Sequence, residues 1–282
     1  MFRSPEERRE RAVRAAVAAA REHGLDPTSP AVLQDWNNTI VRLAPLPLVA
    51  KVSTSPLADG SRSLAREVDV AAHLAARGAP VIPPATLLPP GPHLVEGLVL
   101  TMWEYCAGHP VGETDGESAG RALAAVHAAF LDYPKELPSF DVQTDEVGRL
   151  LKGRGTLPAL TRTDREFLRE QHAVIADALA LQRFEERPLH GEAHLGNVLR
   201  AADGLRWFDF ESACRGPVEW DVTTLPEHGR GAYEVDGELL RLLGRARSLC
   251  VAAWCWVQPD RAPEVAQAAR VHLRLLRDAA AS

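Results

Sequence analysis

The stretch PLHGEAHLGNVLRAADGLRWFDFE, residues 188 to 211, is the part of the sequence that decides the fold. Its two apolar runs, Val198-Leu199 and residues 205–208, are separated by Asp203-Gly204, a dipeptide typical of two-residue β-hairpin turns. A hairpin would bring Asn197, just before its first strand, close to Asp209, at the end of its second strand. An amide oxygen and a carboxylate that converge in this way form a hard-oxygen site suited to Mg²⁺. We therefore expect Asn197 and Asp209 to hold a metal ion.

A third polar residue, Glu192, lies on the loop that leads into the hairpin. A carboxylate followed by an Asn and then an Asp is the order of the catalytic groups in kinases. There the first carboxylate orients the attacking hydroxyl, and the Asn and the Asp hold the metal that bridges the phosphates. The pattern predicts that Glu192 is a catalytic residue. The alternative is a polar hairpin loop with chance spacing, which six polar matches in order make improbable.

These residues resemble the aminoglycoside phosphotransferase family, small-molecule kinases related to choline kinases. The family motif, His-Gly-Asp-x-x-x-x-Asn and then a hydrophobic-Asp-Phe-Glu strand end, matches residues 190–197 and 207–211 except that Glu192 replaces the usual Asp. The resemblance implies an α+β, protein-kinase-like fold of two lobes. We expect a β-rich N-lobe with one key helix over residues 1–103, and a mainly helical C-lobe over residues 104–282.

Lys51 is the first lysine of the chain and lies in the apolar run Val49-Ala50-Lys51-Val52. Apolar residues recur at helical spacing over residues 63–76, and Glu67 falls early in this expected helix. In kinases a strand lysine held by a helix glutamate contacts the α- and β-phosphates of the nucleotide. Alone, Lys51 would better fit an exposed edge strand; together with residues 188–211, it is expected to bind the nucleotide with Glu67.

The resemblance also implies further nucleotide contacts. Asn38-Thr39 matches the turn that covers the phosphates in this family, although an ordinary strand start would look the same. A strand over residues 97–103 would lead into the hinge between the lobes. Trp103 would then lie behind the base, and the Glu104 carbonyl and the Cys106 amide would contact adenine. Since the last two are backbone contacts, their residue types carry little information.

Two residues are expected to support the catalytic loop. Asp221, in the segment 216–222, matches a family Asp that accepts hydrogen bonds from the backbone of that loop. His190 begins the catalytic motif itself. His127, within an expected helix over residues 117–131, is given a packing role only.

The remaining sequence predicts mostly helices. Residues 35–39 should enter the first of two strands in the segment 31–53, whose turn contains Pro45 and Pro47. Residues 163–166 form a candidate capping box for a helix that ends near residue 181. The other expected elements are a helix over 5–23 that starts with Ser4-Pro5, strands at 39–43 and 48–52, and helices over 238–257 and 262–279.

Composition limits the partners. The net charge is −6 and the basic residues form no long run, so nucleic acid is not the expected partner and a cationic acceptor fits better. The four cysteines form no Cys-x-x-Cys pair, which favours reduced thiols in a cytoplasmic protein. The charged N-terminal segment is no signal peptide, and no run of 18 apolar residues is present to span a membrane.

The sequence therefore predicts an O-phosphotransferase that uses Mg²⁺ and ATP or GTP to phosphorylate a hydroxyl of a small molecule. An aminoglycoside or another hydroxylated antibiotic is the first expectation for the acceptor. A metabolic kinase of choline, a sugar or a similar alcohol stays open, as does a nucleotide-binding relative without catalysis. Residues 226–282, where this family forms its acceptor pocket, match no specific motif.

Overall fold

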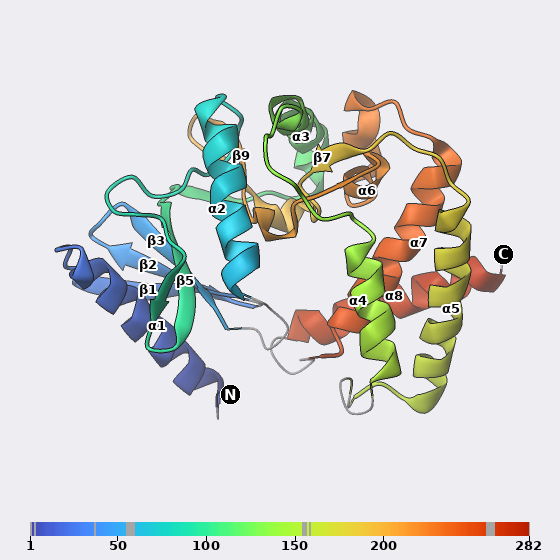
Figure 1. Ribbon diagram of the computed structural model, residues 1–282, viewed down its shortest axis with the longest axis horizontal. Helices are drawn as coiled ribbons and strands as arrows, with labels where there is room; N and C mark the ends of the chain where they lie inside the picture. The colour runs from blue at the N-terminus through green and yellow to red at the C-terminus, as the bar shows by residue number, and fades with distance from the viewer. Residues whose placement is uncertain are drawn as a thin grey trace.

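The computed structural model describes residues 2, 4–36, 38–54, 60–153, 157, 159–257 and 263–281. Its N-terminal part is a five-stranded antiparallel sheet of strand order β1-β2-β3-β5-β4, with α1 and α2 beside it (Figure 1). The elements are α1 (Pro5–Glu22), β1 (Ser29–Asp35), β2 (Asn38–Ala44), β3 (Leu48–Ser53), α2 (Gly60–Ala76), β4 (His93–Val95) and β5 (Leu98–Glu104).

The two faces of this sheet have different partners. Because successive side chains of a strand point to opposite faces, Ala50 and Val52 of β3 pack with the alanines of α1, whereas Val49 packs with residues of α2. Lys51, between Ala50 and Val52, belongs to the α2 face. The alternation of β3 thus directs its one ammonium group towards the C-terminal half of the chain.

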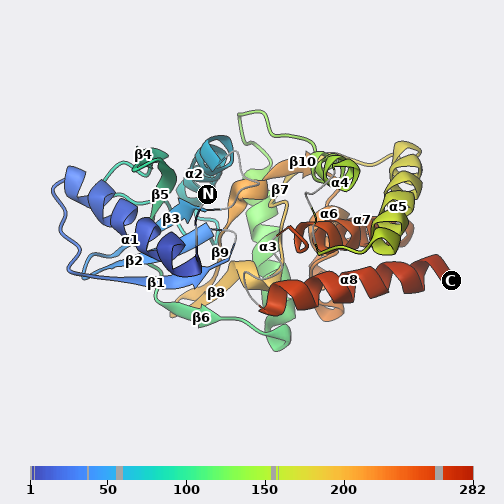
Figure 2. The ribbon, with the colours of Figure 1, turned by 90° about the horizontal axis from the view of Figure 1, so that it is seen from below.

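The C-terminal part is mainly helical and contains two small sheets. β8 pairs with β6 and β9, and β7 pairs with β10. Figure 2 shows α8 along one side of this lobe, beside α7. The elements are β6 (Gly108–Pro110), η1 (Glu113–Asp115), α3 (Gly116–Phe130), α4 (Val142–Lys152), α5 (Arg162–Ala180), β7 (Arg187–Leu189), η2 (Leu195–Asn197), β8 (Val198–Ala201), β9 (Gly204–Trp207), η3 (Phe210–Ser212), β10 (Cys214–Gly216), α6 (Glu219–Val222), η4 (Glu227–Ala232), α7 (Gly237–Trp254) and α8 (Pro263–Ala281).

A shared hydrophobic core joins the two lobes. It contains Val68 and Leu74 of α2, Leu123 of α3 and Trp207 of β9, all buried. A separate core fills the helical lobe around α7. Burial of one continuous apolar cluster by α2 and the β8–β9 hairpin fixes the position of Glu67 relative to the segment that follows β9.

Three local expectations are wrong. Residues 35–39 do not enter the first strand: Ser29–Asp35 is itself strand β1, and the turn to β2 follows it. Pro30 and exposed alternate residues weaken the strand pattern, as is typical of an edge strand. Helix α5 is capped by Thr161, which accepts a hydrogen bond from Asp164 N, and not by Thr163. The β8–β9 hairpin pairs Ala201 with Gly204, so its turn lies one residue earlier than expected.

Most expected elements are present. The N-terminal helix starts at Pro5 with Ser4 as its cap, strands β2, β3 and β5 and helix α3 lie where predicted, and α2 starts earlier than predicted, at Gly60. Residues 258–262, between α7 and α8, lie outside the described residues. All four cysteines are free thiols, and within the described residues no helix has the length and apolarity to cross a membrane. The lobe boundary at residue 103 and the cytoplasmic location stay predictions.

Candidate active site

The β8–β9 hairpin places Asn197 and Asp209 near each other. The carbonyl oxygen of Asn197 accepts a hydrogen bond from Phe208 N at 3.1 Å, one residue before Asp209. The Asn197 side-chain nitrogen donates to the carbonyl oxygen of Glu192 at 2.9 Å. Because its nitrogen is committed in this way, the amide oxygen of Asn197 is the atom left to bind a metal.

Asp209 has an unusual backbone conformation. Its φ of 70° and ψ of 57° lie in the left-handed region, which residues other than glycine rarely adopt. Such a conformation costs on the order of 1–3 kcal/mol and persists where the surrounding structure enforces it, often at functional sites. Here it turns the chain from β9 into η3 and brings Asp209 and Glu211 to the same side.

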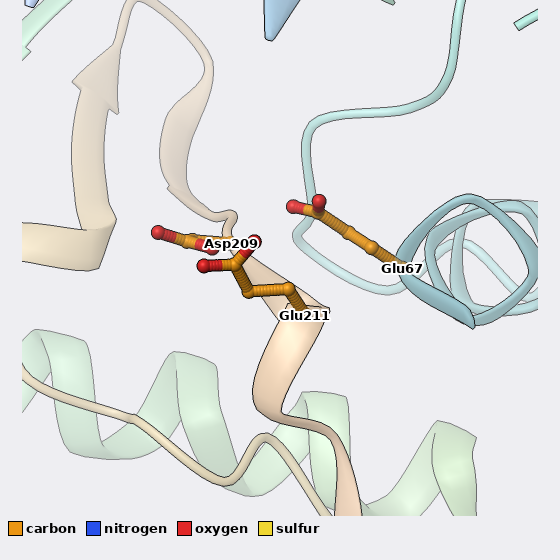
Figure 3. Close-up of side chains that lie close together, drawn as sticks. All are labelled: Glu67, Asp209 and Glu211. Atoms are coloured by element: carbon orange, nitrogen blue, oxygen red, sulfur yellow. The ribbon is translucent and has the colours of Figure 1, made fainter. Parts of the chain in front are cut away.

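Lys51 lies among three carboxylates. Its Nζ is 2.8 Å from Glu67 Oε2, 2.6 Å from Asp209 Oδ1 and 3.3 Å from Glu211 Oε2. Figure 3 shows the three carboxylates close together, Glu67 from α2 and the other two from the segment after β9. One oxygen of each lies within 4.8 Å of the others. The ion pair expected between Lys51 and Glu67, facing Asp209, is confirmed.

The charges of this cluster follow from burial and from Lys51. Burial favours the neutral amine, but the three carboxylates raise the pKa of Lys51 well above its ordinary value, so it stays protonated. Burial favours the neutral form of Asp209 too, yet the charge and the hydrogen bond of Lys51 lower its pKa. Burial raises the pKa of Glu211. Asp209 is therefore the carboxylate of this cluster that is most firmly ionised.

The donor set fits a hard cation. Both Asp209 and Glu67 are bonded to Lys51, but the Asp209 side chain is 27% exposed and offers a charged oxygen, whereas that of Glu67 is only 2% exposed. Carboxylate and amide oxygens are the ligands that Mg²⁺ prefers. Asn197 and Asp209 stay the predicted ligands, and Glu211 adds a carboxylate to which the sequence analysis gave no role.

Glu192 lies at the edge of this cluster with 31% of its side chain exposed. Burial and then the charge of Asp209 raise the pKa of Glu192 to about 7, against the opposing charges of Arg247 and Lys51. Ser212 Oγ donates to its Oε2 at 3.5 Å. A carboxyl group with this pKa can accept a proton near neutral pH, which is what a general base requires.

His190 is a neutral structural histidine. Its Nε2 lies 3.0 Å from the Phe208 carbonyl oxygen, and its Nδ1 lies 3.3 Å from the amide nitrogen of Glu192. Because a carbonyl only accepts and an amide N–H only donates, the proton is on Nε2 and Nδ1 is the acceptor. Burial lowers the pKa of His190 to about 4, in agreement with this neutral tautomer. His190 thus links the catalytic loop to the strand that carries Asp209.

Asp221 supports the catalytic loop as expected. Its carboxylate accepts hydrogen bonds from His190 N at 2.7 Å and Gly191 N at 2.9 Å. It also accepts one from His127 Nε2 at 2.9 Å, and Tyr233 OH donates to His127 Nδ1 at 3.1 Å. Burial opposes ionisation, but the hydrogen bond from His127 and the nearby charges lower the pKa of Asp221. The packing role given to His127 therefore missed its bond to Asp221, 94 residues later.

The hinge segment is compatible with the expected adenine contacts. Trp103 is buried and its indole nitrogen donates to Thr101 Oγ1 at 2.9 Å. Glu104 N donates to Pro83, and Tyr105 N donates to Pro47. Neither hydrogen bond uses the Glu104 carbonyl or the Cys106 N–H, the two groups expected to face the base. Their contacts with a nucleotide stay predictions.

The residues expected to cover the phosphates divide into two kinds. Asn38 Nδ2 lies 3.2 Å and 3.3 Å from the two carboxylate oxygens of Glu211, so Asn38 reaches the charged cluster. Thr39 is fully buried, and its hydroxyl bonds to Asp35 at 2.9 Å and to Thr54 at 3.2 Å. The Thr39 side chain therefore holds the β1–β2 turn, and the nucleotide contacts expected of Asn38 and Thr39 stay predictions.

The comparisons with known proteins agree with this geometry. The profile of the phosphotransferase enzyme family (APH) matches residues 29–259, so the chain belongs to this family. It is accordingly a small-molecule kinase that acts on hydroxyl groups, with a protein-kinase-like fold. No curated protein sequence matches the chain.

Solved structures of low sequence identity share the fold. Choline kinase LicA from Streptococcus pneumoniae has a TM-score of 0.67 at 13% identity, over 93% of this chain and 98% of that one. The complex of amicoumacin kinase hAmiN with AMP-PNP, Ca²⁺ and Ami has a TM-score of 0.67 at 14% identity, over 90% and 89%. The GDP and kanamycin complex of APH(2")-IIia has a TM-score of 0.64 at 14% identity, over 94% and 97%.

Proposed function

We propose that this kinase transfers the γ-phosphoryl group of ATP or GTP to a hydroxyl of an aminoglycoside or another hydroxylated antibiotic. The observation that carries the proposal is the position of Lys51 Nζ between Glu67 and Asp209, at 2.8 Å and 2.6 Å. These residues come from β3, α2 and the segment after β9, and only the fold brings them together. The cluster lies beside Glu192, a carboxyl group able to accept a proton.

The residues have separate roles in the proposed transfer. Lys51, held by Glu67, binds the α- and β-phosphates, and the hinge backbone at Glu104 and Cys106 binds the base next to Trp103. Asn197 and Asp209 hold Mg²⁺, which when bound neutralises negative charge on the phosphates. This division assigns residues 1–103 to the nucleotide-binding lobe and residues 104–282 to the lobe that carries the catalytic loop and the acceptor site.

Glu192 acts on the acceptor. Its carboxylate accepts a hydrogen bond from the attacking hydroxyl, orients it towards the phosphoryl group and takes its proton as the new O–P bond forms. Asp221 and His190 keep the backbone of the loop in place through the hydrogen bonds given above. Most of the rate enhancement in such enzymes comes from positioning and electrostatics.

The charge of the site favours a cationic acceptor. Glu67, Asp209 and Glu211 lie around one lysine, Glu192 lies at the edge of this cluster, and the whole chain has a net charge of −6. An amine-bearing antibiotic fits this charge. Choline or a related amino alcohol fits it too, and choline kinase LicA shares the fold, so a metabolic kinase is the second candidate. The site retains Lys51, Asn197 and Asp209, each held by hydrogen bonds or ion pairs. This argues against the third candidate, a nucleotide-binding protein without catalytic activity.

The proposal is tested with the purified full-length protein. Nucleotide diphosphate release is measured with ATP or GTP, Mg²⁺ and a panel of aminoglycosides, other hydroxylated antibiotics, choline, ethanolamine, aminopropanol and sugars. We expect release above the acceptor-free rate with at least one amine-bearing antibiotic. Asp209→Asn, which removes a metal ligand, is the matched inactive control. Stimulation only by choline or an amino alcohol would replace the first candidate with the second, and no stimulation by any acceptor would refute both.

A further inference from the structure

The carbonyl oxygen of Gly191 is held by an unusual number of donors. It accepts hydrogen bonds from Arg247 Nη2 at 2.9 Å, Trp220 Nε1 at 3.2 Å and Gln143 Nε2 at 3.3 Å. The donors come from α7, α6 and α4, three helices of the C-terminal lobe. This carbonyl belongs to the peptide that joins Gly191 to Glu192, so three helices converge on the backbone immediately before the proposed base.

Arg247 is the charged member of this group. It is 6% exposed, and its guanidinium lies 3.7 Å from the centroid of the Trp220 ring. Its other hydrogen bonds go to the Trp220 carbonyl at 3.3 Å and to Gln143 Oε1 at 3.2 Å. None of the ion pairs found among the described residues involves Arg247. A buried guanidinium without an ion pair is costly. Here its hydrogen bonds go to neutral carbonyl oxygens around the loop, and its charge opposes the rise that burial causes in the pKa of Glu192.

The backbone at Gly191 can adopt its conformation only as glycine. Its φ is +85°, and a Cβ atom at this position would lie 1.8 Å from the carbonyl oxygen of Ser212. Its N–H is bonded to Asp221, as described above, and its carbonyl to the three donors. Gly191 is therefore held on both sides, and the N–H of the peptide that follows it, Glu192 N, is bonded to His190 Nδ1 at 3.3 Å. The orientation of that peptide sets the direction in which the Glu192 side chain leaves the backbone.

We propose that Arg247 is a positioning residue for phosphoryl transfer: through the Gly191 carbonyl it holds the Glu192 backbone in the orientation that aims the carboxylate at the acceptor hydroxyl. The role rests on the proposed function of Glu192. Arg247 contacts neither the Lys51 cluster nor the hinge in the described structure, so its effect belongs to the chemical step and not to nucleotide binding. Trp220 and Gln143 also donate to the Gly191 carbonyl, but the hydrogen bond from Arg247 is the shortest of the three.

The test separates positioning from folding. Arg247→Met removes both hydrogen bonds and charge but keeps an unbranched side chain, and Arg247→Lys keeps the charge but cannot donate several hydrogen bonds in one plane. A misplacement of about 1 Å can cost about 100-fold in rate, so we expect kcat to fall by about 10- to 100-fold in Arg247→Met. The KM values for nucleotide and acceptor should stay within about threefold. Arg247→Lys should recover part of kcat.

Arg245 provides a matched control on the same helix. It is half-buried and donates to an amide oxygen, Gln171 Oε1, at 3.1 Å, away from the loop. Arg245→Met should keep the wild-type kcat. Hydrogen exchange in the full-length variants, measured by mass spectrometry, should show faster exchange over residues 189–195 in Arg247→Met and not in Arg245→Met.

Two outcomes overturn the inference. One is a folded Arg247→Met or Arg247→Lys variant with wild-type kcat. The other is unchanged exchange over residues 189–195 in Arg247→Met, a measurement that needs no acceptor. Failure of the proposed function gives a different result, because wild-type protein would then show no acceptor-stimulated turnover while the exchange measurement still decides whether Arg247 fixes the loop.

Discussion

Replacement of Glu192 by Gln is the most direct test of the proposed chemistry. The amide has the size of the carboxyl group and can keep the contact with Ser212 Oγ, but it cannot take the proton of an acceptor hydroxyl. General-base catalysis typically contributes about 10²- to 10⁴-fold, which corresponds to roughly 3 to 5 kcal/mol of transition-state stabilisation at about 1.36 kcal/mol per decade. We expect kcat to fall by that factor.

The pH dependence of the rate is a second, independent test of the role of Glu192. A base must be deprotonated to act, and burial and Asp209 raise the pKa of Glu192 to about 7. The activity of the wild-type enzyme should therefore fall about tenfold per pH unit as the pH drops below that value. In Glu192→Gln this acidic limb should be absent, because the titrating group has been removed.

Stability should change in the opposite direction from activity. A carboxyl group whose pKa is raised on folding costs stability as the pH rises from its ordinary value, 4.5, to its folded value of about 7. Glu192→Gln removes this cost, so its melting temperature at pH 8 should equal or exceed that of wild type. A loss of turnover therefore cannot be attributed to unfolding.

Initial rates over pH 5.5 to 9 and the affinity for Mg²⁺-nucleotide decide the outcome. Nucleotide affinity should stay within about threefold, because Lys51 and Asp209 are intact, whereas Asp209→Asn should lower both affinity and rate. Glu192→Asp should stay partly active, since it restores the usual family residue at a shorter reach. Wild-type turnover in Glu192→Gln would refute the role of this residue, though not the kinase fold.

Three further variants test the support of the site. Lys51→Met should weaken Mg²⁺-nucleotide binding more than about tenfold in calorimetric titrations. Mg²⁺ alone should raise its melting temperature more than that of wild type, because three clustered carboxylates lose their counter-ion; equal shifts would contradict this. Asp221→Asn should lower the free energy of unfolding by about 3 kcal/mol in urea titrations, since buried N–H groups lose a charged acceptor, and a loss under about 1 kcal/mol would argue against that support. Gly191→Ala should remove turnover while nucleotide still binds, because its Cβ would overlap Ser212; a fully active variant would show that the loop can shift freely.

Local sequence was sufficient for the elements with strong periodicity and for the motif of residues 188–211. Apolar spacing predicted α2 and α3, the Ser4-Pro5 start predicted α1, and runs of apolar and β-branched residues predicted β2 and β3. Edge strand β1 was missed because Pro30 and its exposed side chains weaken the alternation. The N-cap of α5 was misplaced by two residues because two threonines satisfy nearly the same capping pattern, and only the hydrogen bond to Thr161 distinguishes them.

The motif spacing also predicted which residues take part in the proposed chemistry, but not how they are held. Glu192, Asn197 and Asp209 lie within one hairpin and its loop, so their proximity follows from short-range chain geometry. Lys51 lies 158 residues from Asp209, and a lysine in an apolar strand could equally be an exposed edge residue. Its place was decided by the alternation of β3 together with the core that packs α2 against the hairpin.

Only the tertiary structure revealed which helices of the C-terminal lobe support the catalytic loop. His127 reaches Asp221 from α3, and Arg247 reaches the Gly191 carbonyl from α7 across 56 residues. Arg247 belongs to no local pattern, because a single polar side chain on an apolar helix face is compatible with many roles. Its partner is set by how the helices pack, and that packing depends on the sum of many weak apolar contacts which no single segment of the sequence encodes.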